Sequence, residues 1–129
     1  MLIALVGWAL SVGHLGSTRT LKCDFASGVF HAWGENTKIN SDHFTLIYDS
    51  IDVKARTARL IGNVGSSDVV ALETPEHLSF LEVTPNGNVT LTTVYRTGAA
   101  APYPAIHSRH VGLLTEPWGS QMYGSCSPF

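Results

Sequence analysis

EHLSFLEVTPNGNVTLTTVYRT, residues Glu76–Thr97, places two runs rich in Val, Thr, Leu, Phe and Tyr on either side of a turn sequence. The turn is Thr84-Pro85-Asn86-Gly87. Its proline presets φ at the second position, and its glycine can adopt the left-handed conformation of a bulged three-residue hairpin loop. The flanking runs suit a pleated surface. The stretch therefore predicts a β-hairpin with strands His77–Val83 and Asn88–Arg96.

Segments with strand composition recur at short intervals on both sides of this hairpin, and the chain after the first twenty residues shows no helical period. The further strands are expected at Thr20–Phe25, Val29–Trp33, His43–Asp52, Thr57–Val64, Asp68–Glu73, Ala105–Leu114 and Gln121–Cys126. Because neighbours in sequence tend to pair, we expect an all-β antiparallel meander of about eight strands. It would form a small barrel or a barrel-like sandwich.

Turn residues and alternation add detail to these strands. Ser27-Gly28 is expected to form a turn or a bulge, and Gly65–Asp68 a turn. In His43–Asp52, alternation separates Phe44, Leu46 and Tyr48 from Thr45, Ile47, Asp49 and Ile51. In Thr57–Val64, one face would carry Ala58, Leu60, Gly62 and Val64. Glycine at position 62 suggests a bulge or a close backbone approach.

Composition narrows the range of partners. Among 129 residues, 8 are Lys or Arg and 10 are Asp or Glu, which gives a net charge of -2. No basic patch is visible, which argues against binding to nucleic acid or to anionic membrane surfaces. Apolar residues make up 44% of the chain, too many for a disordered protein. We therefore expect a folded domain whose partner is an unknown protein or small molecule.

The first fifteen residues, MLIALVGWALSVGHL, form an apolar run that is too short for a comfortable transmembrane helix. It is typical of the apolar region of a secretory signal peptide. We expect residues 1–16 to be a signal peptide and residues 17–129 to be a single β domain, without membrane integration once the leader is removed. The alternative is a buried first helix or strand.

Two cysteines support export to the periplasm or the extracellular space. Cys23 follows the leader and Cys126 lies near the C-terminus, so one disulfide would join the first strand to the last. The alternative is two unrelated buried thiols. No zinc spacing or metalloprotease motif is present, and no metal, cofactor or catalytic residue is assigned.

The densest polar cluster is Ile106-His107-Ser108-Arg109-His110. On a strand, His107 and Arg109 share one face and His110 lies on the other, so the two histidines would not chelate one ion. A carboxylate or another anion bound by His107 and Arg109 is the more credible site. The alternative is a polar face in which Arg109 pairs with a cross-strand acid such as Glu82 or Asp49.

The loop Gly98–Pro104 precedes this cluster. The strand ending at Arg96 is expected to pair with the segment after the loop and to bring Tyr95 or Arg96 near His107 and Arg109. The candidate ligand or partner surface is therefore Tyr95, Tyr103, His107 and Arg109. It would lie at the barrel end opposite the Asn86-Gly87 tip, since functional residues concentrate on loops that a rigid scaffold holds.

Three segments resemble an uncharacterised family of small exported bacterial all-β proteins. They are DSIDVKARTARLIGNVGSSDV at Asp49–Val69, AIHSRHVGLL and SQMYGSC. The resemblance spans about Leu21–Pro128. It implies an exported bacterial setting and carries no activity, ligand or site residue.

A stable β scaffold without a catalytic or metal motif favours a small exported binding module of unknown ligand, which would be protein-interaction or inhibitor-like. One alternative is a carrier of a small apolar ligand inside the barrel. Another is an enzyme that acts on an anionic substrate through His107 and Arg109.

Overall fold

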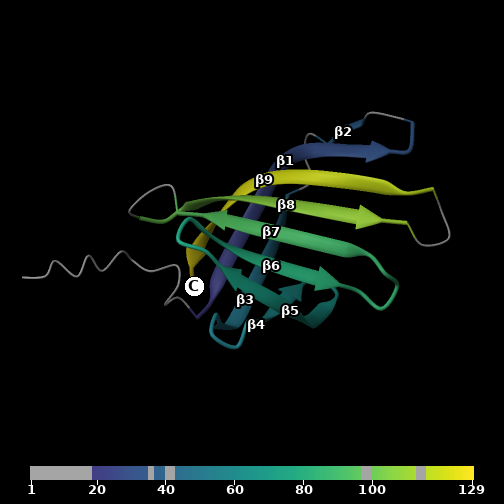
Figure 1. The fold of residues 1–129 in the computed structure, drawn as a ribbon. Coiled ribbons are helices and arrows are strands. Elements are labelled where there is room, and N and C mark those ends of the chain that lie inside the picture. Colours follow the sequence, from purple (N-terminus) through teal and green to yellow (C-terminus); the bar gives the residue numbers. More distant parts are fainter. Residues whose placement is uncertain (1–18, 35–36, 40–42, 97–99, 113–115) are drawn as a thin grey trace, which may run out of the picture.

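Figure 1 shows the fold in a computed structural model, which describes residues 19–34, 37–39, 43–96, 100–112 and 116–129. The predicted signal peptide, residues 1–16, lies outside the described residues. Within those ranges the chain forms a single nine-stranded antiparallel sheet. The strands are β1 (Leu21–Ala32), β2 (Thr37–Ile39), β3 (Phe44–Asp52), β4 (Thr57–Gly62), β5 (Gly65–Glu73), β6 (His77–Val83), β7 (Val89–Tyr95), β8 (Tyr103–Val111) and β9 (Trp118–Pro128).

The sheet closes on itself. From β3 to β9 each strand pairs with the next in sequence, and β1 pairs with both β3 and β9. Eight strands, β1 and β3–β9, therefore form a barrel, while the short β2 pairs with the outer part of β1. Figure 1 shows the first and last strands side by side, β1 in blue and β9 in yellow. The prediction of an all-β meander of about eight strands is confirmed, as a barrel.

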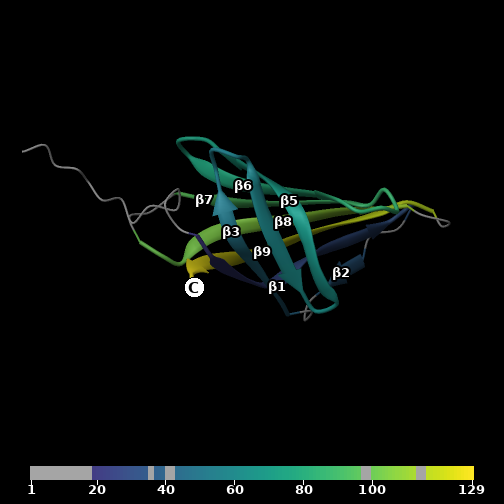
Figure 2. The same ribbon diagram turned by 90° about the horizontal axis from the view of Figure 1, so that it is seen from below.

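The strand β1 determines where the barrel is closed. Leu21–Phe25 pairs with β3, whereas Gly28–Phe30 pairs with β2. Opposite β9, the register shifts between Phe25 and Ser27, so the bulge lies just before the expected Ser27-Gly28, which are themselves paired, and the two predicted strands are one. Figure 2 shows the long strands β1, β8 and β9 running on beyond the strands that cross them. The barrel is therefore closed at one end and widens at the other, which we call the mouth.

The core fills the closed end. The rings of Tyr48 and Phe80 stack with centroids 3.9 Å apart, and both side chains are buried. Burying an aromatic or large aliphatic side chain stabilises a fold by about 1.5–3 kcal/mol. The other core residues with no measurable exposure include Leu21, Phe25, Ala71, Leu78 and Val94.

The predicted disulfide is confirmed. Cys23 on β1 lies directly opposite Cys126 on β9, with Cα atoms 4.0 Å apart. Both cysteines are fully buried. The bond links strands 103 residues apart in the sequence at the seam of the barrel.

The β6–β7 hairpin is confirmed as predicted, with Val83 opposite Val89. The Gly87 N–H donates to the Thr84 carbonyl at 2.8 Å, and Gly87 has a φ of 81°. The Thr84 N–H donates to the Asn88 carbonyl at 2.9 Å, and the Asn88 N–H donates to the Thr84 hydroxyl at 3.1 Å. The turn therefore combines the proline, glycine and threonine of the sequence in one hydrogen-bonded loop.

The predicted alternation of side chains between the two faces of β3 is not observed beyond the first part of the strand. Ser50 has a φ of 51°, and the β3–β4 register shifts between Asp49 and Asp52. This bulge turns Ile51 into the core, where it is 5% exposed, so its assignment to the face opposite Tyr48 was wrong.

The β4–β5 connection also differs from the prediction. Gly62 pairs with Gly65, so the turn is Asn63-Val64 and Val64 is fully exposed. Residues 65–68 belong to β5 and do not form the expected turn. A Cβ at Gly62 would meet only a Leu46 methyl carbon, at 3.9 Å. The close backbone approach suggested for Gly62 occurs instead at Gly28 and Gly124, where β1 and β9 meet.

The last two strands are longer at their start than predicted. The strand β8 begins at Tyr103 and includes Pro104. Pairing with β7 starts only at the next residue, Ala105, so Pro104 is not needed as a donor in that ladder. The strand β9 begins at Trp118, before the predicted start at Gln121. Arg109, paired with Ser120, and Val111, paired with Trp118, extend the β8–β9 ladder towards the mouth.

Candidate functional site

An open cavity of about 360 Å³ occupies the barrel mouth. Its lining comes mainly from inward-facing positions of β3, β4, β6, β7 and β8 and from the β4–β5 turn. The lining residues are Phe44, Leu46, Leu60, Gly62, Asn63, Val64, Glu82, Thr90, His107 and Arg109. The cavity is within the size range of small-molecule sites.

One wall of this cavity is apolar. Phe44 and Leu46 project from β3, and Leu60 from β4. Phe44 stacks on the buried Phe25 at 5.2 Å between centroids and makes an edge contact with the His107 ring at 5.5 Å. These contacts hold the Phe44 ring in its position in the protein without a ligand.

A chain of buried polar side chains lies behind His107, which lines the cavity. Thr92 Oγ1 lies 2.7 Å from His107 Nδ1 and 2.6 Å from the Tyr48 hydroxyl. Burial, and secondarily the charge of Arg109, lower the pKa of His107 to about 4. Burial raises the pKa of Tyr48 well above its ordinary value. At neutral pH this buried chain is therefore uncharged, and His107 serves as a hydrogen-bonding group.

The rim carries opposite charges separated by one strand. Glu82, Thr90 and Arg109 occupy successive strands, since Thr90 is opposite Glu82 on one side and Arg109 on the other. The Glu82 carboxylate accepts hydrogen bonds from Ser67 and, at 3.5 Å, from Thr90. The Arg109 guanidinium lies 5.6 Å from the centre of the Trp118 ring.

Arg109 has no carboxylate partner in the part of the chain that the structure describes. The acids considered as its partners are otherwise engaged. Asp49 receives two hydrogen bonds from Arg59, at 2.8 and 3.0 Å, which lower the pKa of that carboxyl. Glu82 is held by hydroxyls. The alternative in which Arg109 pairs with Glu82 or Asp49 was therefore wrong.

The four residues of the predicted surface do not lie together. His107 and Arg109 share the mouth cavity. Tyr103 is 4% exposed in the core, and Tyr95 lies 6.1 Å from the His77 ring, centre to centre. The register places His107 opposite Thr92 and Arg109 opposite Thr90, whereas Tyr95 lies beyond Val94 at the other end of β7.

The expectation that Tyr95 or Arg96 lies near His107 and Arg109 was therefore wrong. Arg96 instead pairs with Glu73 at 3.1 Å. The mouth lies at the end of the barrel that carries the Asn63-Val64 turn and the Asn86-Gly87 tip, so the expectation of a surface opposite that tip was also wrong. The loop Gly98–Pro104, of which residues 98 and 99 lie outside the described ranges, leads into β8 at the other end.

Sequence reasoning missed Thr90 and considered Glu82 only as a partner for Arg109. A signal was present, because alternation along β6 puts Glu82 on the same face as the core residues Leu78 and Phe80. A carboxylate at the end of an apolar strand face marks the point where the barrel interior becomes a polar rim. The outer face of β8 carries His110, consistent with its predicted separation from His107.

In the described ranges, no three side chains of His, Cys, Asp or Glu converge in a way that could hold a metal ion. The described residues include no helix of the length and apolarity needed to cross a membrane. No protein-family model matches the chain, and neither does any curated protein or solved structure.

Proposed function

We propose that the protein binds a small organic anion with an apolar body in the barrel mouth. The observation that carries this proposal is Arg109, a permanent cation without a carboxylate partner in the described ranges, on the rim of a cavity with an apolar wall. This proposal joins two of the sequence-based alternatives, the small apolar ligand and the anion at His107 and Arg109.

The apolar body of the ligand would lie against Phe44, Leu46 and Leu60. Phe44 and Leu46 are partly exposed and Leu60 is 8% exposed, so a ligand would remove their remaining apolar surface from water. Ligand sites of this kind combine mainly apolar walls with a few polar groups that fix orientation.

The anionic group would bind Arg109, whose guanidinium can hold a carboxylate in bidentate fashion. His107 would add a hydrogen bond without charge, because its lowered pKa keeps it neutral. The Glu82 carboxylate on the same rim disfavours ligands with several negative charges. The site therefore favours a monoanion, or a zwitterion whose cationic group approaches Glu82.

A titration of the full chain with linear and aromatic monocarboxylates, hexanoate and phenylacetate among them, would test this. We expect saturable shifts of backbone amide NMR signals at Thr90, His107 and Arg109. Arg109→Gln should weaken binding at least about tenfold, since hydrogen bonds to a charged group contribute about 1.5–3 kcal/mol.

Two further variants sharpen the test. Gly62→Leu would project a side chain into the mouth, which Gly62 lines, and should therefore abolish binding. A Cβ at Gly62 meets no backbone atom, so the sheet can accept the substitution. Arg59→Gln removes a cation that lies outside the cavity and should leave binding unchanged. Equal affinities for the wild type, Arg109→Gln and Gly62→Leu would contradict the proposal. Conversion of the bound anion into product would instead support the enzyme alternative at the same residues.

A second candidate, the protein-interaction module, is favoured by the outer face of β5–β7. Val70 lies opposite Leu81, and Leu81 opposite Leu91, so three apolar side chains form a row across three strands. Val83 beside them is 63% exposed. A partner protein with a complementary apolar face would cover this row. Leu91→Glu should abolish a specific complex without affecting the binding of carboxylates in the mouth.

We also propose that the protein is exported. The disulfide and the apolar run at residues 1–15 support this location. Mass spectrometry of the mature protein should find residues 1–16 removed and the two cysteines oxidised. Retention of residues 1–15 would contradict the proposal.

A further inference from the structure

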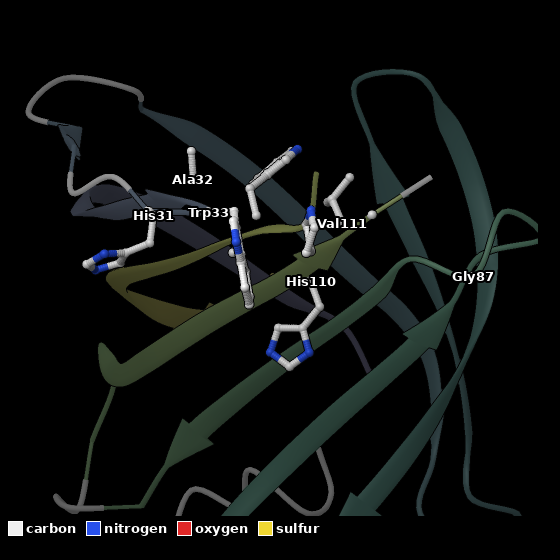
Figure 3. A pocket seen from close by; sticks show the side chains of 11 residues that line it. His31, Ala32, Trp33, Gly87, His110 and Val111 are labelled. Carbon is white, nitrogen blue, oxygen red and sulfur yellow. The ribbon is translucent and has the colours of Figure 1, made fainter. Parts of the chain in front are cut away.

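A second cleft, of about 580 Å³, lies beside the mouth over the ends of β1, β8 and β9. Figure 3 shows His31 and Trp33 on one side of it, with His110 and Val111 of β8 and, farther across, Gly87 of the β6–β7 turn. The described lining residues are His31, Ala32, Trp33, Gly34, Gly87, His110, Val111, Gly112, Pro117, Trp118 and Gly119.

Two tryptophans form its apolar walls. The side chain of Trp33 is 70% exposed, although indole rings usually bury most of their surface. Trp118 is held in place, because Phe30 packs against it at 4.9 Å between ring centroids and Arg109 lies 5.6 Å from its ring centre. The cleft therefore combines one fixed indole with one exposed indole.

The polar groups of the cleft carry little charge. None of the described lining residues is Asp, Glu, Lys or Arg, and the ionisable side chains among them are the imidazoles of His31 and His110. Gly34, Gly87, Gly112 and Gly119 add no side chains to the cleft, so a ligand can come close to the backbone there, although the Gly87 N–H already donates to Thr84 and Gly119 lies between β1 and β8 in the sheet. A Cβ at Gly34 or Gly87 would meet no atom within 4 Å, which shows how open the cleft is at these positions.

From this lining we infer that the cleft binds a neutral saccharide. A sugar ring has an apolar face of C–H groups, which suits an indole, and a periphery of hydroxyls, which can both donate to and accept from backbone groups and imidazoles. Aromatic side chains with one apolar surface and nearby hydrogen-bonding groups suit ligands of this mixed character.

The same features disfavour other occupants. An ionic polymer would find no counter-charge among the lining residues that the structure describes. A proline-rich peptide also docks into aromatic grooves, but its prolines have no N–H group to donate, whereas the hydroxyls of a sugar can donate as well as accept. The inference is separate from the carboxylate site, since the cleft and the mouth cavity share no lining residue.

Isothermal titration calorimetry of the full chain with neutral hexasaccharides would test the inference. The probes are cellohexaose, maltohexaose and hexa-N-acetylchitohexaose, with polygalacturonate as a charged comparison and an octaproline peptide as the competing class. We expect saturable binding to at least one neutral probe, together with a shift of the Trp33 indole N–H signal in NMR spectra.

Trp33→Ala should weaken that binding at least about tenfold, the scale of one aromatic contact. The matched control is Phe129→Ala, because Phe129 is 73% exposed but lies outside the cleft; this variant should bind like the wild type. Trp33→Phe should recover part of the affinity, because it restores an aromatic face.

Failure of all three neutral probes would overturn the inference. So would binding of octaproline alone, or neutral-saccharide binding that Trp33→Ala leaves unchanged. Because Trp33 is exposed, its replacement should not prevent folding, and an unchanged thermal midpoint would show that a loss of binding is local.

Discussion

Thr92 Oγ1 lies 2.7 Å from His107 Nδ1 beneath the barrel mouth, and both side chains are buried. The same hydroxyl lies 2.6 Å from the Tyr48 hydroxyl, so one threonine joins polar groups from β3, β7 and β8. Buried polar networks of this kind stabilise a fold only while every member keeps its partner.

Replacing this hydroxyl should therefore be costly. Thr92→Val keeps the shape of the side chain but leaves two buried groups without their partner, so we expect a loss of about 1–3 kcal/mol in unfolding free energy. Urea denaturation would measure it. The control is Thr93→Val, which removes a hydroxyl that hydrogen-bonds Ser79 at 3.0 Å in a partly exposed position. An equal loss in both variants would argue against a special role for the buried network.

His107 should make the fold sensitive to acid. Its pKa is about 4 in the folded protein, below the ordinary value of 6.5, so the unfolded chain takes up the proton first as the pH falls. Stability is therefore lost between about pH 6.5 and pH 4, by up to about 3 kcal/mol for the wild type relative to a variant without this imidazole.

Comparing the unfolding free energies of the wild type and His107→Gln from pH 7.5 to pH 4 would check this, since Gln does not titrate. The gap between them should shrink or reverse in acid. His43→Gln removes an exposed imidazole and should follow the wild-type profile. Parallel profiles for the wild type and His107→Gln would contradict the prediction.

The disulfide should contribute substantially to stability. Because it closes a long loop, replacing both cysteines in Cys23→Ala/Cys126→Ala should lower the unfolding free energy by about 2–5 kcal/mol. Denaturation of this variant and of the reduced wild type would measure the effect. The two should agree closely; a midpoint equal to that of the oxidised protein would show that the strand pairing alone closes the barrel.

Two strand glycines should respond in opposite ways to alanine. A Cβ at Gly124 would lie 2.8 Å from the Phe25 Cα atom and would also run into the Asp24 carbonyl, so Gly124→Ala should cost about 3 kcal/mol or prevent folding. Gly62→Ala meets only a methyl carbon at 3.9 Å and should be neutral or stabilising by up to about 1 kcal/mol. Thermal unfolding would compare them, and equal midpoints would refute the steric argument.

The sequence predicted local features well because their causes are local. The turn from Thr84 to Asn88 contains its own proline, glycine and hydroxyl, so neither the hairpin nor its register depended on distant residues. The position of Ile51 could not be predicted in this way. It depends on the left-handed backbone conformation of Ser50, which serine rarely adopts. This conformation accompanies the register shift between β3 and β4.

The candidate site was predicted in part. Alternation alone placed His107 and Arg109 on one face, and both line the mouth. Tyr95 was misplaced because the register between β7 and β8 depends on the loop between them, whose geometry its composition does not determine. The cleft at Trp33 and Trp118 was not predicted, since these residues come from opposite ends of the sequence and meet only when β1 pairs with β9.

That pairing also determines when the fold can be completed. The strand that seals the barrel follows the other strands in the sequence, so a chain that stops before Trp118 has no partner for the β9-facing edges of β1 and β8. Two such bare edges are templates for adding strands from other molecules. Contacts between distant parts of a chain also form slowly. A chain truncated before Trp118 is therefore an open sheet prone to self-association, and the eleven residues of β9 convert it into a closed barrel.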